Sequence, residues 1–178
     1  SQNLKLTIRD LFQNPTIEQV TPYISATSIV IEQGAVEGEV RLTPIQRWFF
    51  TQDLTDAHHW NQAMMLTHPA GIDEAALRQA LQKLVEHHDA LRMVYITKED
   101  SIAEVCQINR SNTGELFTLE VLDLCDESDV RVRLEREGTR IQSGINLQEG
   151  PLVQAGLFRT KQVDYLLIAI HQLVVDGV

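Results

Sequence analysis

The pattern of apolar and polar residues near the C-terminus predicts a strand over residues 163–171 that is buried on both faces. Its even- and odd-numbered positions are both apolar from Tyr165 to Ile170. Successive strand side chains point to opposite faces, so this strand should be central in a covered sheet. The same alternation sends His171 and Gln172 to opposite faces. An Asp176-Gly177 turn follows, and we expect a functional site at this sheet edge, because loops at the ends of scaffold strands commonly carry function.

Helical spacing of apolar residues predicts the helices of the chain's main body. Thr43 caps one helix, which has Pro44 at its first position. Asp73 caps the clearest helix, whose inward face would carry Leu77, Leu81, Leu84, Val85 and His88. A charged amphipathic helix is expected over 129–143. The expected strands cover 60–67, 91–97, 102–108, 116–122, 152–159 and 163–171.

The first 40 residues differ from this body. Residues 1–24 predict two short helices, separated by Asn14-Pro15, with Thr16 capping the second. Helices this short cannot bury a core by themselves. Residues 25–40 are small and acidic with glycines, which is typical of a linker, although 29–31 can form a brief strand. We therefore predict segments 1–24, 25–40 and 41–178.

Composition excludes several classes of function. The net charge of −10 gives no broad basic surface, so nucleic acid is not an expected partner. The longest apolar run, Leu166–Ile170, is too short to cross a membrane, and the N-terminus lacks the features of a signal peptide. We expect a cytoplasmic protein in which Cys106 and Cys125 are reduced structural thiols.

Pairs of adjacent histidines raise the question of a metal site. His58-His59 and His87-His88 have no Cys or carboxylate at a spacing that would complete a ligand set. We therefore expect no metal. His88 and Trp48 lie on apolar faces and are expected in the core.

Four segments of the chain resemble nonribosomal peptide synthetases. They are LTPIQRWFF at 42–50, HWNQ at 59–62, HHDALR at 87–92 and HQLVVDG at 171–177. They look like the N-terminal lobe of the condensation/epimerization superfamily, and more like its epimerization branch. Residues 4–24 look like the last helices of a peptidyl carrier domain. The resemblance implies an α/β two-layer sandwich, similar to chloramphenicol acetyltransferase, with a short helical carrier remnant before it.

The resemblance also implies an activity and its partners. An epimerization domain is an isomerase that converts the α-carbon of an aminoacyl or peptidyl thioester from L to D during antibiotic biosynthesis. The substrate arrives on the 4'-phosphopantetheine arm of the carrier, and the domain binds no cofactor directly. Carrier and adenylation domains would lie upstream, and a second lobe and a further synthetase module downstream. The lobe alone should leave an apolar sheet surface uncovered.

The last segment matches the superfamily's His-His-x-x-x-Asp-Gly motif except at one position. His171, Asp176 and Gly177 match it, and Gln172 stands where the family has its catalytic histidine. A carboxamide cannot act as a base near neutral pH. Losing such a group typically lowers the rate by about 10²- to 10⁴-fold, so we predict little or no epimerase activity. The glutamine is either an engineered change or a natural one.

Other residues of the motif invite structural interpretations. His171 is either a buried histidine bound to backbone or a proton-transfer group. Asp176 is expected to be a buried carboxylate that needs a charged partner, and the family pattern implies Arg92. Gly177 would permit a turn conformation that other residues avoid. Asn61 and Gln62 either contact substrate or face solvent.

Two further functions remain compatible with the sequence. A condensation domain would form an amide bond by acyl transfer on the same scaffold. A carrier-docking lobe without catalysis would be consistent with the lost histidine.

Overall fold

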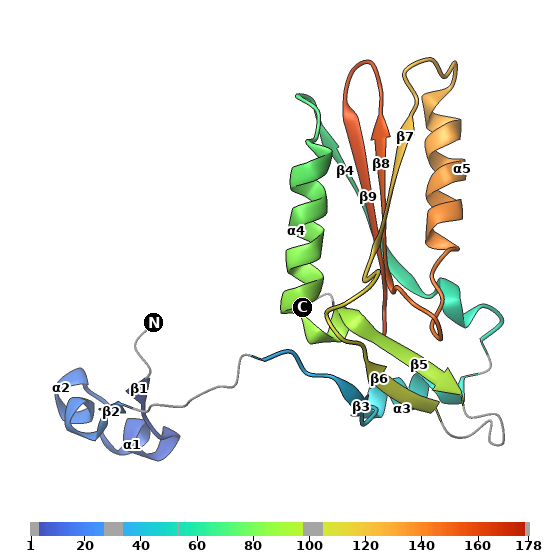
Figure 1. Ribbon diagram of the computed structural model, residues 1–178. Helices are drawn as coiled ribbons and strands as arrows, with labels where there is room; N and C mark the ends of the chain where they lie inside the picture. The colour runs from blue at the N-terminus through green and yellow to red at the C-terminus, as the bar shows by residue number, and fades with distance from the viewer. Residues whose placement is uncertain (1–3, 27–33, 53, 98–104, 177–178) are drawn as a thin grey trace. The chain divides into compact units, whose positions relative to one another are not determined.

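The computed structural model describes residues 4–26, 34–52, 54–97 and 105–176. The chain divides into two compact units, residues 1–34 and residues 35–178 (Figure 1).

The first unit is a small helical piece closed by a short strand pair. Strand β1 (Leu4–Lys5) pairs antiparallel with β2 (Ser25–Ala26). Between them lie α1 (Ile8–Gln13), α2 (Ile17–Val20) and the 3₁₀ helix η1 (Thr21–Tyr23).

Capping side chains set the beginnings of these helices. Thr7 and Asp10 form a reciprocal capping box, so α1 begins at Ile8, later than the apolar spacing alone predicted. Thr16 caps α2 as predicted. The unit leaves large apolar side chains exposed, namely Ile8, Leu11, Phe12, Ile17 and Tyr23.

The second unit is built around a four-stranded sheet. Its strands are β4 (Asn61–His68), β9 (Asp164–His171), β8 (Val153–Arg159) and β7 (Thr118–Asp123), in that spatial order. Strands β7 and β8 are parallel, and the other pairs are antiparallel. The predicted central position of the last strand is confirmed, because β9 lies between β4 and β8. At the edge, β4 exposes Met64, Met65 and Leu66, in keeping with the expected uncovered apolar surface.

A smaller antiparallel sheet has the order β3-β6-β5. It contains β3 (Gly38–Val40), β6 (Val105–Asn109) and β5 (Met93–Thr97). The end of the predicted linker therefore belongs to the body, because β3 gains a ladder of backbone hydrogen bonds to β6. The possible strand at 29–31, like the start of the strand predicted at 102–108, lies outside the described residues.

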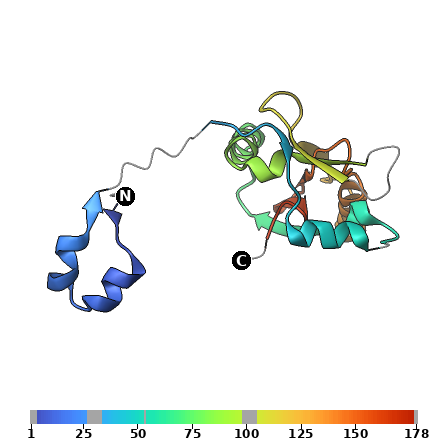
Figure 2. The same cartoon turned by 90° about the horizontal axis from the view of Figure 1, so that it is seen from below.

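The helices of this unit begin at the predicted residue or within one residue of it. Thr43, Asp73 and Asp129 cap α3 (Pro44–Thr51), α4 (Glu74–His87) and α5 (Val130–Gln142). Short 3₁₀ helices are η2 (Ala57–His59) and η3 (Asp89–Arg92). Helices α4 and α5 stand on either side of the large sheet (Figure 1), and the view from below separates them again (Figure 2).

The main core lies among α3, α4 and both sheets of the second unit. It includes Phe49, Leu81, Val85, Tyr95, Leu152, Val153, Ala155 and Ala169. Two predicted core residues are not in it. Trp48 is 52% exposed because it lines a cavity described below, and His88 is exposed because α4 has already ended before it. Within the described residues, no helix has the length and apolar character needed to span a membrane.

Candidate functional site

The pairing of β4 with β9 places Trp60 opposite Gln172. Asn61 is the register partner of His171, and one step further the Gln172 N–H donates to the Trp60 carbonyl at 2.9 Å. Residues directly opposed across an antiparallel pair have side chains on the same face. The register alone therefore brings an indole beside the carboxamide.

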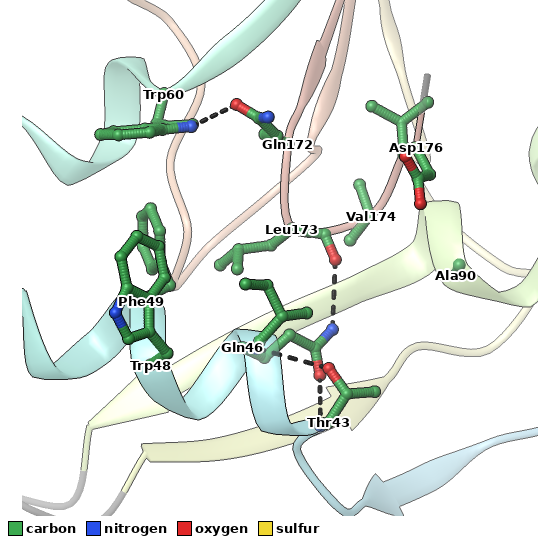
Figure 3. A pocket seen from close by; sticks show the side chains of 12 residues that line it. Thr43, Gln46, Trp48, Phe49, Trp60, Ala90, Gln172, Leu173, Val174 and Asp176 are labelled. Carbon is green, nitrogen blue, oxygen red and sulfur yellow. Dashed lines mark hydrogen bonds between the residues drawn. The ribbon is translucent and has the colours of Figure 1, made fainter. Parts of the chain in front are cut away.

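The two side chains are hydrogen-bonded to one another. The Trp60 indole Nε1–H donates to Gln172 Oε1, as the dashed line in Figure 3 marks. An indole N–H can only donate, so the carboxamide atom that faces it is the oxygen. The amide nitrogen of Gln172 is turned away from the indole (Figure 3).

His171 is fully buried and held by backbone groups. Its Nδ1 accepts from the Leu173 N–H at 3.2 Å, so in the neutral ring Nε2 carries the proton and donates to the Ala57 carbonyl at 2.9 Å. Burial lowers the pKa of His171, although the hydrogen bond to Ala57 opposes this shift. These contacts favour the structural interpretation of His171, because both ring nitrogens are engaged.

Phe49, on helix α3, contacts both Trp60 and His171. Its ring lies edge-on to the indole at a centroid distance of 5.8 Å and edge-on to the imidazole at 5.7 Å. Phe49 is 5% exposed. Edge-to-face packing is a favourable arrangement of aromatic rings, so α3 helps to fix the position of Trp60.

Gln46 ties α3 to the turn that follows β9. Its Oε1 accepts from the Thr43 N–H at 2.9 Å, completing a capping box. Its Nε2 donates to the Leu173 carbonyl at 3.1 Å and to the Tyr95 hydroxyl at 3.0 Å. Burial raises the pKa of Tyr95, so this hydroxyl stays protonated. One buried amide thus connects a helix start, a strand and the turn that carries Gln172.

Two cavities meet at the Trp60–Gln172 pair. The first, of about 410 Å³, is lined mainly by α3 and the turn at 172–176, including Ile45, Trp48, Val174 and Asp176 (Figure 3). The second, also about 410 Å³, is lined by Asp56, His59, Trp60, Asn61 and Gln172. Trp60 and Gln172 line both cavities. Their hydrogen bond therefore lies in the wall that the cavities share.

Arg92 has a different carboxylate beside it from the one that we expected. Its guanidinium contacts the Asp89 carboxylate and backbone carbonyls of Val36, Val85, Glu86 and Arg110. These contacts occupy all five N–H groups, and two of the carbonyls belong to the last turns of α4. The predicted burial of Asp176 is wrong, because the turn carries it to the exposed rim of the first cavity. Gly177 lies outside the described residues.

The adjacent histidines do not share one role. His58 Nδ1 accepts from the Leu147 N–H at 3.0 Å, whereas His59 lines the second cavity. Across the described part of the chain, no group of three or more His, Cys, Asp or Glu residues is placed to hold a metal ion. Asn61 lines the second cavity, and Gln62 is exposed on β4.

The sequence did not predict the contact between Trp60 and Gln172 or the roles of Phe49 and Gln46. Gln46 left a readable signal, since Thr43 and Gln46 have the spacing of a capping box. The contact between Trp60 and Gln172 left none, because it depends on the strand register.

Comparison with known proteins gives consistent matches over nearly the whole chain. The family model for the condensation domain matches residues 36–178. Tyrocidine synthase 2 of Brevibacillus parabrevis is 51% identical over 173 residues, which is 97% of this chain and 5% of that protein.

Two solved structures share the fold. The epimerization domain from the third module of tyrocidine synthetase B is 52% identical, with a TM-score of 0.79 over 83% of this chain and 33% of that one. The starter condensation domain of rhizomide synthetase is 22% identical, with a TM-score of 0.61 over 80% of this chain and 34% of that one. The predicted α/β class is confirmed. The chain spans about a third of each solved domain.

Proposed function

Because this chain belongs to the condensation-domain family of nonribosomal peptide synthetases, as its motifs indicated, we propose that residues 41–178 are the N-terminal lobe of an epimerization domain. Such a domain inverts the α-carbon of an aminoacyl or peptidyl thioester held on a phosphopantetheine arm. We propose further that Gln172 leaves the domain with little or no epimerase activity.

One observation carries the choice of epimerization. The chain is 52% identical to a solved epimerization domain, whereas its 22% identity to a solved condensation domain supports a common fold alone. The residues around the site support the same choice, because the WNQ of 60–62 and the VVDG of 174–177 resemble the epimerization branch.

The chemistry of the site supports the loss of activity. Inverting the α-carbon requires a group that removes the α-proton and a donor that returns one to the opposite face. Gln172 has no basic nitrogen at neutral pH, and neighbouring His171 has both ring nitrogens bound to backbone. Without the imidazole at position 172, the rate should fall by about 10²- to 10⁴-fold.

The remainder of the chain is assigned by the same resemblance. We propose that residues 1–24 are the end of the preceding carrier domain. The rest of that carrier domain would cover the exposed apolar side chains of α1 and α2. A second lobe after residue 178 would cover the apolar edge of β4. Adenylation and carrier domains of the same polypeptide would deliver the substrate, and a downstream module would receive it.

The test compares the full polypeptide that contains this chain with its Gln172→His variant. Both are loaded with an L-aminoacyl thioester, and the fraction of D-aminoacyl thioester is measured over time. We expect the histidine variant to be about 10²- to 10⁴-fold faster. Gln162→His, an exposed change in the β8–β9 turn, is the matched control and should remain slow. Rapid epimerization by the unmodified protein would refute the proposed inactivity.

A condensation domain is the second candidate, because the matching family model is that of the condensation domain. The same Gln172→His protein distinguishes the two. Amide formation with a second carrier-bound amino acid, in place of D-aminoacyl thioester, would identify a condensation domain. Binding of the loaded carrier with no product from either variant would identify a docking lobe.

A further inference from the structure

We propose that Trp60 orients the carboxamide of Gln172 so that its amide nitrogen donates a hydrogen bond to the carbonyl oxygen of the carrier-bound thioester. The residue that replaces the catalytic base would thus be a specific ligand-binding group. This inference rests on the proposed function, because that function supplies the thioester.

The orientation of the carboxamide follows from its contacts. The indole N–H of Trp60 engages Gln172 Oε1, and the backbone N–H of Gln172 is bound to the Trp60 carbonyl. The indole is itself held edge-on by Phe49, which is buried. Rotating the carboxamide by a half turn would set its NH₂ against the indole N–H, two donors facing each other. The contacts therefore favour one orientation, with Oε1 on the indole and Nε2 away from it.

The position of the pair makes the remaining donor accessible to a ligand. Gln172 is exposed and lines both cavities, and Trp60 is 39% exposed. The first cavity, which Gln172 lines, is also lined by apolar side chains such as those of Ile45, Trp48 and Val174. A hydrogen bond formed among apolar walls contributes more than the same bond in open water.

The chemistry of the donor selects the class of ligand. The side of the carboxamide that is turned away from the indole presents its two N–H groups, which pair with acceptors such as a carbonyl oxygen and cannot pair with an ammonium group. A thioester presents one acceptor of this kind, its carbonyl oxygen, next to the α-carbon. We therefore expect the site to bind a carbonyl without removing the neighbouring proton.

The experiment measures binding of two stable analogues to the full polypeptide by calorimetry. One is an aminoacyl pantetheine in which an amide replaces the thioester and keeps the carbonyl. The other is a thioether in which a methylene group replaces the carbonyl. We expect the carbonyl analogue to bind about tenfold more tightly, the effect of one good hydrogen bond.

Variants at Gln172 test the donor itself. Gln172→Glu keeps the size and an oxygen for the indole, but it offers acceptors in place of the NH₂. The preference for the carbonyl analogue should disappear in this variant. Gln162→Glu adds the same charge at an exposed site away from the cavities, and its preference should stay near tenfold.

Variants of the two tryptophans test the orienting role. Trp60→Phe keeps an aromatic ring but removes the N–H that fixes the carboxamide, so the preference should fall to about threefold. Trp48→Phe removes an indole N–H from the same cavity at a residue with no side-chain bond to Gln172. It should change the affinity for both analogues equally and leave their ratio unchanged.

The outcomes separate this inference from the proposed function. Equal binding of the two analogues by the unmodified protein would overturn the inference and leave the proposed function standing. An unchanged preference in Trp60→Phe would overturn the orienting role of Trp60. If neither analogue binds, both the inference and the proposed substrate are wrong.

Discussion

Strand β9 has a buried polar residue at each end, and the two residues are stabilised by different kinds of contact. At the first residue, the Asp164 carboxylate pairs with the Arg159 guanidinium and accepts from the Ile72 N–H at 2.7 Å. At the last residue, His171 is neutral and uses two backbone groups. One end is held by charge and the other by neutral hydrogen bonds.

The kind of contact at each end of β9 corresponds to the structure next to it, which is a closed turn at one end and two cavities at the other. Asp164 and Arg159 join the β8–β9 turn to the loop before α4, so this end is closed by an ion pair. Beyond His171, the chain continues to Gln172 and a turn that lines two cavities. A neutral anchor there leaves the cavities without a strong buried charge to compete for a ligand. Both anchoring residues are buried, but only the site end leads directly into an exposed residue, Gln172, that lines the cavities.

The largest expected effect comes from breaking the charged end. Arg159→Met removes the partner of Asp164, which is 5% exposed, and leaves a buried carboxylate. The free energy of unfolding should fall by about 3 kcal/mol, measured by urea denaturation. Arg131→Met breaks the exposed Arg131–Glu135 pair and is the control, with an expected change below about 0.5 kcal/mol. Similar losses in the two variants would remove the contrast between the ends.

A smaller effect is expected from loosening the site end. Gln46→Leu leaves the Leu173 carbonyl and the Tyr95 hydroxyl without their amide donor, and should cost about 2 kcal/mol of unfolding free energy. Gln52→Leu, an exposed glutamine at the end of the same helix, is the control. If the two variants have equal stability, Gln46 does not anchor the turn.

The smallest expected effect is a pH dependence of the free energy of unfolding, which arises from His171 at the site end. The pKa of His171 in the folded protein lies below its ordinary value of about 6.5. As the pH falls below that value, the unfolded chain takes up a proton that the folded protein does not, so stability is lost. The loss is steepest between the lowered pKa of folded His171 and about 6.5, and its slope cannot exceed about 1.4 kcal/mol per pH unit.

The measurement compares the unfolding free energy at pH 7 and at pH 5 in the unmodified protein and in His171→Gln. Every other titrating group is common to the two proteins, so the difference between their slopes reports on His171. The variant should lose less stability on acidification. Parallel slopes would mean that His171 titrates with the same pKa in both states.

The elements of this fold were predictable where local chemistry defines them. Thr43, Asp73 and Asp129 cap helices by accepting hydrogen bonds from backbone groups three residues ahead, and this preference is visible in the sequence. The two-sided apolar pattern of residues 163–171 predicted a central strand, because only a covered strand can bury both faces.

The predictions failed where a residue's surroundings come from distant segments. Trp48 lies on an apolar helix face that lines a cavity instead of packing into the core. Asp176 was expected to be buried, but the turn after β9 leaves it exposed. The expected partner of Arg92 failed for a local reason instead, because Asp89, only three residues before it, supplies the carboxylate that contacts it.

The sequence by itself determined the capped helices, the central strand, the family and the amide at position 172. It did so because capping, alternation and motif spacing are local properties. Only the tertiary structure decided that Trp60 meets Gln172, that His171 is held neutral by backbone, and that two cavities share one wall. These depend on the β4–β9 register and on the packing of α3, which bring together residues more than a hundred positions apart.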